Sequence, residues 1–492
     1  MVTLNKISPH IKNSFSQTLR QLAMIVYRYP LFAMVVLSVL TNIYLIFDYG
    51  VVNRSALSML WAVEQGSTDN ASVSVFAQLI SGVHSLTGLS YINSAYLLMI
   101  VSYTGIVVLL LLIAQWLGFS LLAQWSLIFL LLSHPNFCDF RSYIIVEPLF
   151  WLLWILAIYL LLRLYKTHTI LAIFCWLFLF LCATRFSVAA WFWLLLFPFG
   201  ALFWKPWRRK SVAYALLGYA VIVGVLLFLP IYHGTTPIAW LQETIIANPQ
   251  PLFDALRLKD NNWVKEDDIL MSTVFVFSGA SSLILIRTMI GLSILCLILA
   301  VYSVLKKQYR IVNYDYLRII IYAIIFDFMI AVTLLVLSAD RSSVLSFSIS
   351  LLLLLLSAQG LSYVFQKMAM GRYSRVSFLV IIWCLVAYFA SGFIIFGPRK
   401  DHFREAGEYF VKTHTEQVLY SEDSLALFYA NRNPAMQLNR NDAEHVSEIT
   451  DFYYAYAKNH HNDLPEFWQS QKVIARFHND RNDEVIIFHL GK

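Results

Sequence analysis

The sequence predicts an α-helical polytopic membrane protein of about eleven transmembrane helices, followed by a small C-terminal extracytoplasmic α/β domain. Of the 492 residues, 59% are hydrophobic and only 13% are charged. A soluble domain carries about 25% charged residues, so this chain lacks the charged surface that water requires. Long apolar runs continue to residue 397, whereas 398–492 have a soluble composition. We therefore expect a transmembrane domain over 1–397 and a separate domain over 398–492.

Apolar segments of suitable length occur throughout the first domain. A helix that crosses a hydrocarbon core of roughly 30 Å needs about 20 apolar residues. Some of the segments are shorter than this, and their edges are not sharply defined. The predicted spans are 30–47, 92–117, 119–134, 146–164, 168–184, 187–204, 211–232, 280–305, 317–338, 343–365 and 376–397.

Basic residues gather in alternate loops and predict the orientation. Lys and Arg are enriched in cytoplasmic loops, which also explains the net charge of +7 without nucleic-acid binding. The rule places the N-terminus in the cytoplasm, and eleven spans place the C-terminus outside a plasma (bacterial inner) membrane. The loop 118–119 is an exception because it carries no charge. The basic residues are Lys6, Lys12, Arg20 and Arg28, then Arg163 and Lys166, Lys205, Arg208, Arg209 and Lys210, Lys306, Lys307 and Arg310, and Lys367, Arg372 and Arg375.

Two of the outer loops are long. The first, 48–91, contains two amphipathic stretches, "SALSMLWAVEQG" and "SVSVFAQLISGVHSLTG", which predict helices lying on the membrane. The second covers 233–279. The five cysteines lie in or beside apolar runs and predict no disulfide framework, and no spacing suggests zinc. The first apolar run lacks a small-residue cleavage site, so it predicts a retained span.

The C-terminal segment predicts alternating helices and strands. "DHFREAGEYFVKTH" and "SLALFYANRN" predict helices, and "QVLYS" predicts a short strand. "KVIARFHNDRNDEVIIFHL" predicts a hairpin whose turn is Asn-Asp-Arg-Asn-Asp. "FYYAYA" is interpreted as helix packing and "KNHHNDL" as a solvated loop.

Several charged residues stand at predicted outer ends of spans. Asp48 closes the first apolar run in "LIFDYGVVNRS", and it is either an ordinary helix-end acid or a functional carboxylate at the bilayer surface. Glu147 lies just inside its span, where a carboxylate suggests function or an ion pair with Arg141 or Arg185. Asp139 shares the outer loop of Arg141. For the arginines, including Arg287 and Arg341, the alternatives are snorkelling to the interface and phosphate binding.

The stretch 142–188 resembles the GT-C superfamily of integral-membrane glycosyltransferases. Glu147, followed by Pro148 and Leu149, opens a Leu-rich span that closes with Arg163, and the next span ends in Thr184-Arg185. The position of Asp48 and the two C-terminal segments "FREAGEYFVKTHTEQVLYSEDSLALFY" and "VIARFHNDRNDEVIIFHL" also match. These segments are similar to the external domains of bacterial relatives of protein O-mannosyltransferases and aminoarabinose-lipid A transferases. The Asp-Glu doublet of many mannosyltransferases is absent, since Tyr49 follows Asp48.

The resemblance implies a GT-C-like fold and a hexosyl or pentosyl transferase of the cell envelope. Such enzymes move a sugar from a polyprenyl-phosphate donor to a lipid, glycan or protein acceptor on the outer face. They use an outer-loop carboxylate and usually invert the anomeric centre. This implies Asp48 as the base, with Glu147 and Asp139 as further candidate catalytic carboxylates. Substrate binding is assigned to Arg141, Arg185, Arg287 and Arg341. No metal ligands are assigned, and the cofactor is unknown, because members of the superfamily differ in their need for a divalent cation.

Two other functional classes share the many spans. In a transporter or flippase, Asp327, the most deeply placed charge, would be a proton relay. A structural pairing with Arg287 or with a polar neighbour is the alternative. A polysaccharide polymerase or ligase usually carries paired arginines in a large late loop, but 233–279 offers only Arg257 and lysines. A C-terminal domain outside the cytoplasm favours the glycosyltransferase over both.

Overall fold

The computed structural model describes most of the chain. The described residues are 28–49, 52–64, 71–164, 167–187, 189–201, 210–228, 236, 239, 269–305, 314–338, 342–372, 374–393, 400–414, 417–433, 436–447, 450–458, 463–479 and 481–491. The chain forms two compact units. The membrane-helix unit comprises Met1–Thr41, Ile100–Cys138 and Val146–Phe393, and the mixed unit comprises Asn42–Met99, Asp139–Ile145 and Ile394–Lys492. The part of the mixed unit within 400–491 is called the C-terminal domain below.

Six described helices are long and apolar enough to cross a membrane, or up to eight segments if each of two bent helix pairs is one span. This makes the chain a multi-pass membrane protein. Each of the eleven predicted spans coincides with helix, but α9 (Thr169–Ala183), α10 (Ala189–Ala201) and α11 (Lys210–Leu227) are shorter. The count of eleven therefore stays a prediction. The six helices are α2 (Pro30–Tyr49), α5 (Tyr91–Trp116), α8 (Glu147–Leu164), α16 (Tyr314–Ser338), α17 (Ser342–Ala369) and α18 (Arg375–Phe393).

Two helix pairs are bent, and the bend of the second pair falls within a predicted span. The pair α6 (Leu121–Leu132) and α7 (Pro135–Arg141) bends by 57°, and the pair α14 (Ile269–Leu292) and α15 (Ile294–Leu305) bends by 98°. The predicted span over 280–305 therefore contains a sharp break between its two helices. Ser293 lies between the second pair with φ +69°, and its hydroxyl accepts a hydrogen bond from the Cys296 N–H at 3.4 Å. Ser293 thus ends one helix and caps the next, a role that an unbroken apolar run does not reveal.

Helix α17 is the packing centre of the membrane-helix unit. It contacts α6, α14, α15 and α16, and most of its apolar stretch is buried. At Gly360 an added Cβ would clash with the backbone of Leu299, so the two helices meet backbone to backbone. Little of α18 is buried, and apolar side chains such as Trp383 are exposed along it.

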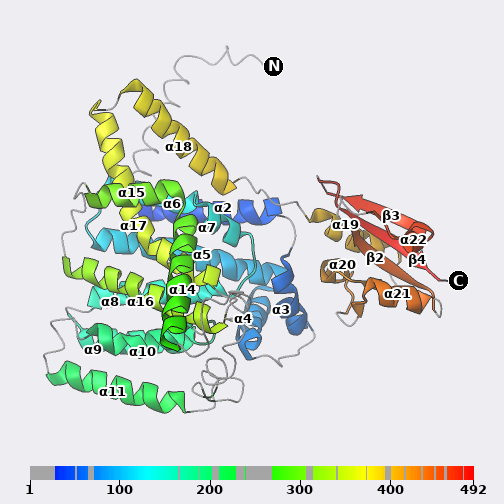
Figure 1. Ribbon diagram of the computed structural model, residues 1–492, viewed down its shortest axis with the longest axis horizontal. Helices are drawn as coiled ribbons and strands as arrows, with labels where there is room; N and C mark the ends of the chain where they lie inside the picture. The colour runs from blue at the N-terminus through cyan, green and yellow to red at the C-terminus, as the bar shows by residue number, and fades with distance from the viewer. Residues whose placement is uncertain are drawn as a thin grey trace. The chain divides into compact units, whose positions relative to one another are not determined.

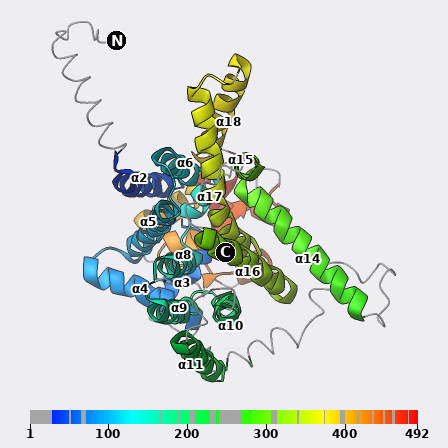
Figure 2. The same cartoon turned by 90° about the vertical axis from the view of Figure 1, so that its left-hand side faces the viewer.

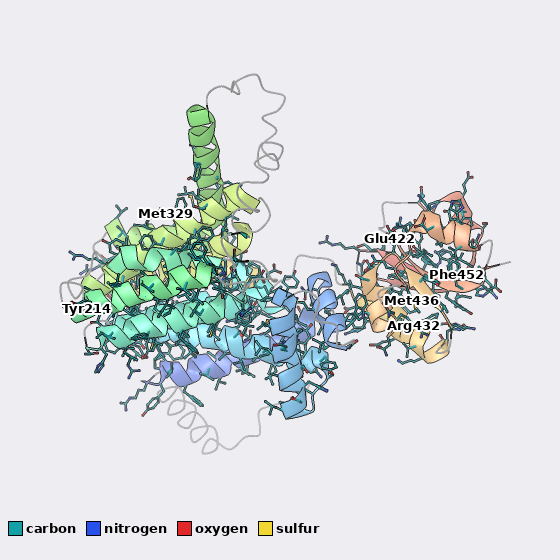
Figure 3. The ribbon with its side chains drawn as sticks, turned by 90° about the horizontal axis from the view of Figure 1, so that it is seen from below. Tyr214, Met329, Glu422, Arg432, Met436 and Phe452 are labelled. Carbon is teal, nitrogen blue, oxygen red and sulfur yellow. The ribbon has the colours of Figure 1, made fainter. Side chains whose placement is uncertain are left out.

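A second layer of the same unit contains α8, α9, α10 and α11, and α9 contacts the other three (Figure 2). Trp176 and Trp193 meet within it, with ring centroids 5.8 Å apart. Tyr214 of α11 and Met329 of α16 are exposed, and both are labelled in Figure 3. Exposed apolar side chains on long helices are what lipid contact requires.

The segment between the first two predicted spans, 48–91, forms the two amphipathic helices that the sequence predicts. They are α3 (Arg54–Glu64) and α4 (Ala71–Thr87), and they contact each other. Leu57 and Leu60 of α3 are buried, as are Phe76 and Ile80 of α4. The helical periodicity of these buried residues confirms the prediction of helices.

The C-terminal domain is a four-stranded sheet with helices on both faces (Figure 1). The strand order is β1-β2-β4-β3, with β1 and β2 parallel and the other pairs antiparallel. The predicted helices, the first strand and the hairpin are confirmed. The elements are α19 (Asp401–Thr413), β1 (Leu419–Ser421), α20 (Ser424–Tyr429), α21 (Arg440–Ser447), β2 (Phe452–Lys458), α22 (Glu466–Gln469), β3 (Lys472–His478) and β4 (Glu484–Leu490).

The interpretation of "FYYAYA" as helix packing was wrong, because this segment is the inner strand β2. Its side chains alternate between the two faces of the sheet. Tyr454 and Tyr456 join the core with Trp468 of α22, whereas Tyr453 meets Phe410 of α19 at 5.4 Å. The loop "KNHHNDL" lies largely outside the described residues.

Candidate functional site

Asp48 lies in the last turn of α2 and is half-buried. The following residues, Gly50 and Val51, lie outside the described residues. The structure then continues with Val52 and Asn53 directly before α3. Asp48 therefore stands where the first membrane helix gives way to the amphipathic helices of the mixed unit, as the sequence predicts.

Asn53 connects this exit to a second predicted site segment. Its side-chain amide donates to the Ile144 carbonyl at 3.3 Å, and its side-chain oxygen accepts from the Ile144 N–H at 3.0 Å. The amide thus imitates one rung of a β-ladder and holds the backbone at Ile144, in the segment 139–145. Asn53 is not among the site residues that the sequence predicts, although an Asn immediately before an amphipathic stretch is a signal for a helix start.

The segment fixed by Asn53 carries Asp139 and Arg141. Both belong to α7, a helix that begins with Pro135 at a position where its missing N–H does no harm. Arg141 is completely buried, whereas Asp139 is exposed and its carbonyl accepts a hydrogen bond from the Ser142 hydroxyl at 2.7 Å. A buried guanidinium carries a large desolvation penalty. Arginine also presents a rigid, bidentate fork that matches phosphate oxygens.

The segment 48–91 and the C-terminal domain touch each other within the mixed unit. The Val52 N–H donates to the Tyr429 hydroxyl at 2.8 Å, and the rings of Trp61 and Phe428 meet edge to face at 5.8 Å. Burial raises the pKa of Tyr429, so the phenol stays neutral. At Gly407 an added Cβ would clash with Tyr429, which shows how closely α19 approaches α20. The exit of the first membrane helix is thereby attached to the domain that follows the last one.

The remaining predicted residues belong to the membrane-helix unit. Glu147 is half-buried in the first turn of α8, where its charge also complements the helix dipole. Arg185 follows α9 and is exposed, and Arg287 lies half-buried within α14. Arg341 lies outside the described residues. The sequence also predicts that Asp48, Glu147 and at least one of these three arginines line one cavity. Because Asp48 belongs to a different unit from the others, this stays a prediction.

Asp327 is held by neutral hydrogen-bond donors in the membrane-helix unit. It is completely buried, the Trp193 indole N–H donates to Oδ1 at 3.3 Å, and the Ser348 hydroxyl donates to Oδ2. Trp193 comes from α10 and Ser348 from α17, so Asp327 of α16 joins three helices. The structural pairing with a polar neighbour is thereby confirmed.

No family model and no curated protein matches the chain. Among solved structures, the chain is similar to the Archaeoglobus fulgidus oligosaccharyltransferase, tethered to an acceptor peptide with an NVT sequon, at a TM-score of 0.46 and 11% identity. The match covers 84% of this chain, which spans 60% of the length of that protein. It is also similar to Cupriavidus metallidurans ArnT bound to undecaprenyl phosphate (TM-score 0.42, 11% identity, 93% and 97% of the two chains). The apo form of ArnT matches at 0.39 and 13% identity, over 92% and 97%.

Both proteins are members of the GT-C superfamily that the sequence resembles. All three TM-scores lie below 0.5, so the likeness by itself does not assign an activity to this chain.

Proposed function

We propose that the protein is a glycosyltransferase that moves a sugar from a polyprenyl-phosphate donor to a lipid, glycan or protein acceptor at the outer face of the membrane. One observation carries the proposal. The Asn53 amide attaches the exit of the first membrane helix, where Asp48 stands, to the segment that holds Asp139 and the buried Arg141. A carboxylate and a guanidinium are the two groups that this transfer needs.

The chemistry assigns one role to each group. The Asp48 carboxylate accepts the proton of the acceptor hydroxyl as the acceptor oxygen forms a bond to the anomeric carbon. The bond from that carbon to the donor phosphate oxygen breaks, and the polyprenyl phosphate leaves with the electron pair. The Arg141 fork stabilises the charge that develops on the phosphate, so a strong general acid is unnecessary. Asp139 and Glu147 orient the acceptor, and Arg185, Arg287 and Arg341 offer further phosphate contacts. A divalent cation, if bound, would supply additional charge stabilisation.

The direct test is a transfer assay on the purified full-length protein with a panel of polyprenyl-phosphate sugars. Undecaprenyl phosphate, the lipid bound in the ArnT structure, is the carrier to use first. Release of polyprenyl phosphate coupled to glycosylation of an acceptor is the expected result. Transport of a lipid or solute across vesicles without any glycosyl transfer would contradict the proposal and favour the transporter.

Asp48→Asn tests the base. The amide has the size of the carboxylate but cannot take a proton, so the initial transfer rate should fall by about 10²–10⁴-fold, the usual range for general acid–base catalysis. Asp442→Asn on the exposed surface of α21 makes the same chemical change away from the proposed site. Its rate should equal that of the wild type. Equal rates for wild type and Asp48→Asn would return Asp48 to the class of ordinary helix-end acids.

The proposal also requires the orientation that the basic loops predict. A reporter enzyme that is active only outside the cytoplasm should work when fused after Lys492 and fail when fused after Arg208. Activity after Arg208, or its absence after Lys492, would reverse the topology and place the proposed chemistry on the wrong side.

A further inference from the structure

The C-terminal domain contains a polar cavity of about 550 Å³ that the proposed transfer does not use. This volume lies in the range of ligand pockets, roughly 300–1,000 Å³. The cavity lies at the carboxyl ends of the parallel strands β1 and β2, since Glu422 directly follows β1 and Lys458 ends β2. Crevices at the carboxyl ends of parallel strands are where ligands bind in many α/β folds.

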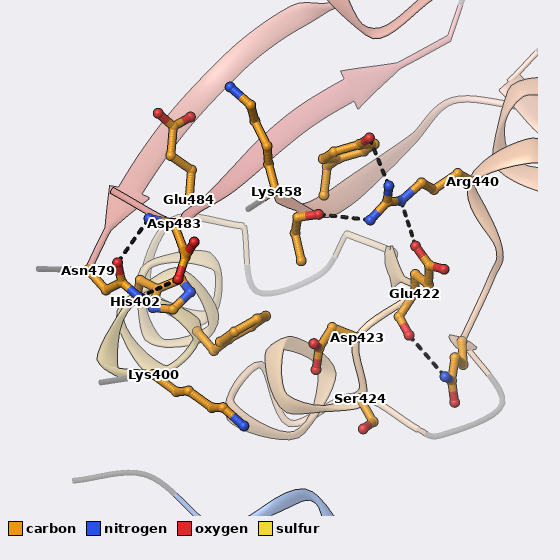
Figure 4. Close-up of a pocket in the computed structure, with 14 residues that line it drawn as sticks. Lys400, His402, Glu422, Asp423, Ser424, Arg440, Lys458, Asn479, Asp483 and Glu484 are labelled. Atoms are coloured by element: carbon orange, nitrogen blue, oxygen red, sulfur yellow. Dashed lines mark hydrogen bonds and ion pairs between the residues drawn. The ribbon is translucent and has the colours of Figure 1, made fainter. Parts of the chain in front are cut away.

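Two walls of the cavity are fixed by hydrogen bonds. On one, Arg440 pairs with Glu422 at 2.6 Å, and it also donates to the Tyr456 hydroxyl at 3.0 Å and to the Ala457 carbonyl at 2.9 Å. On the opposite wall, the Asn479 side chain donates to the Asp483 carboxylate at 3.0 Å (Figure 4). Donors and acceptors held in this way lose little freedom when a ligand binds.

The charges of the lining select the kind of ligand. Three cationic side chains and four carboxylates line the cavity, so a phosphate or another strong anion would face net repulsion. The described residues contain no group of three or more side chains suited to a metal ion. The lining is also too polar for a lipid chain. Charges of both signs interspersed in this way suit a neutral ligand with many hydroxyl groups, which can donate to carboxylates and accept from Lys or Asn side chains.

Phe403 is the large apolar side chain that borders the cavity. It stands in the first turn of α19 and is largely buried. A sugar ring has a rim of hydroxyl groups and an apolar face of C–H groups, so it matches a polar wall beside a phenyl ring. We propose that this cavity binds a neutral saccharide. The site goes beyond the proposed transfer, because binding here requires no turnover.

Saccharide binding to the full-length protein in a detergent without a sugar headgroup tests the site. The probes are glucose, galactose, mannose, N-acetylglucosamine and a linear trisaccharide of each, followed by ligand-observed NMR and calorimetry. Asp423→Asn and Lys400→Met change two lining residues on the same side of the cavity (Figure 4). Asp423 caps α20 through the Leu425 N–H at 2.9 Å, and Asn keeps that cap, so the fold is retained.

We expect at least one probe to bind at a single saturable site, with an affinity that falls at least tenfold in each variant, because hydrogen bonds to charged groups are the strong ones. Lys412→Met and Asp442→Asn, two exposed residues outside the cavity, should stay within twofold of the wild type. Lys458→Met repeats the test from β2 should Lys400→Met lower the thermal midpoint.

The inference is overturned if no probe binds, if the cavity variants bind like the controls, or if only inorganic phosphate or a polylysine peptide competes for the cavity. Asp48→Asn separates this site from the transfer site. Saccharide binding that survives Asp48→Asn but is weakened by Asp423→Asn supports the cavity. Binding that is lost only with Asp48→Asn assigns the saccharide to the transfer site and overturns the inference.

Discussion

The membrane-helix unit and the C-terminal domain hold their charged side chains in different ways. Asp327 is completely buried, and its partners are the neutral donors Trp193 and Ser348. Arg440, with a side chain 40% exposed, instead pairs with the oppositely charged Glu422, which is 46% exposed. Burying a second charge beside Asp327 would add another desolvation penalty, and a neutral hydrogen-bond donor avoids that cost. At a wetted surface an ion pair keeps most of its hydration, so opposite charges are tolerated but contribute little.

Their packing differs as well. In the membrane-helix unit, Gly360 lets α17 approach the backbone of α15, whereas the core of the C-terminal domain is filled by large rings such as Tyr454, Trp468 and Phe488. Lipid tails are as apolar as leucine, so helices in a membrane gain from close contact between small residues. In water, burial of a large ring is itself the main gain. Three pairs of substitutions, each a variant with its matched control, test this comparison.

The largest effect on stability is expected from Gly360→Ala. The added methyl group would meet the backbone of Leu299, which cannot rotate away. Unfolding in mixed micelles should show a loss of about 3 kcal/mol, at the upper end for overpacking.

Gly218→Ala in α11 is the matched control, since nothing described lies within 4 Å of its added Cβ. Alanine is the better helix former, so this variant should be as stable as the wild type or slightly more stable. Equal losses for the two variants would mean that close backbone approach does not hold the membrane-helix unit together.

Ser348→Ala should have an intermediate effect. It removes one of the two hydrogen bonds to the buried Asp327 carboxylate. A buried group that loses a hydrogen-bond partner lowers the free energy of unfolding by about 1–3 kcal/mol. Ser357→Ala lies on the same helix and is also completely buried, but its hydroxyl donates to the Cys296 carbonyl at 2.8 Å. That variant should lose only about 1 kcal/mol, the value of a neutral hydrogen bond. A loss for Ser357→Ala as large as that for Ser348→Ala would show that Asp327 gains nothing special from its donors.

The smallest effect is expected from Arg440→Met. It removes an exposed ion pair and two hydrogen bonds, to Tyr456 and Ala457, for a loss of about 1 kcal/mol. Arg404→Met removes the ion pairs of an exposed arginine with Asp401 at 3.4 Å and Glu408 at 4.0 Å, and it should change stability by less than about 0.5 kcal/mol. Thermal unfolding of the two variants is measured in about 0.05 and about 0.5 M salt. The higher salt shortens the Debye length and screens exposed charges, so it shows how much of each loss of stability is electrostatic. If Arg440→Met lost more stability than Ser348→Ala, the exposed ion pair would matter more than the buried hydrogen bonds of Asp327, which is the opposite of what we expect.

Elements that depend on residues close together in sequence could be predicted, whereas elements that depend on distant residues could not. The β3–β4 hairpin could be predicted because its turn signal and its strands are adjacent in sequence. Strand β2 could not be predicted, because "FYYAYA" becomes a strand by pairing with β1 and β4, which lie far from it along the chain. The break at Ser293 was hidden because an apolar run gives no sign of the backbone inside it.

The same limit applies to the sites. Asp48 stands where the end of the first apolar run indicated, a local signal. The contribution of Asn53 depends on a partner 91 residues away, and the polar cavity gathers side chains from several separate segments of the C-terminal domain. No local pattern identifies such groups, so only the folded chain brings them to notice.

The strand order β1-β2-β4-β3 has a consequence for biosynthesis. Strand β4 is the last of the four to leave the ribosome, yet it is the one that joins β2 to β3. Until it arrives, the nascent domain exposes two unpaired strand edges, which invite pairing with other chains. Because domains otherwise fold as they are synthesised, the sheet must wait for its final strand, and a chaperone that shields strand edges is the help it would need during that interval.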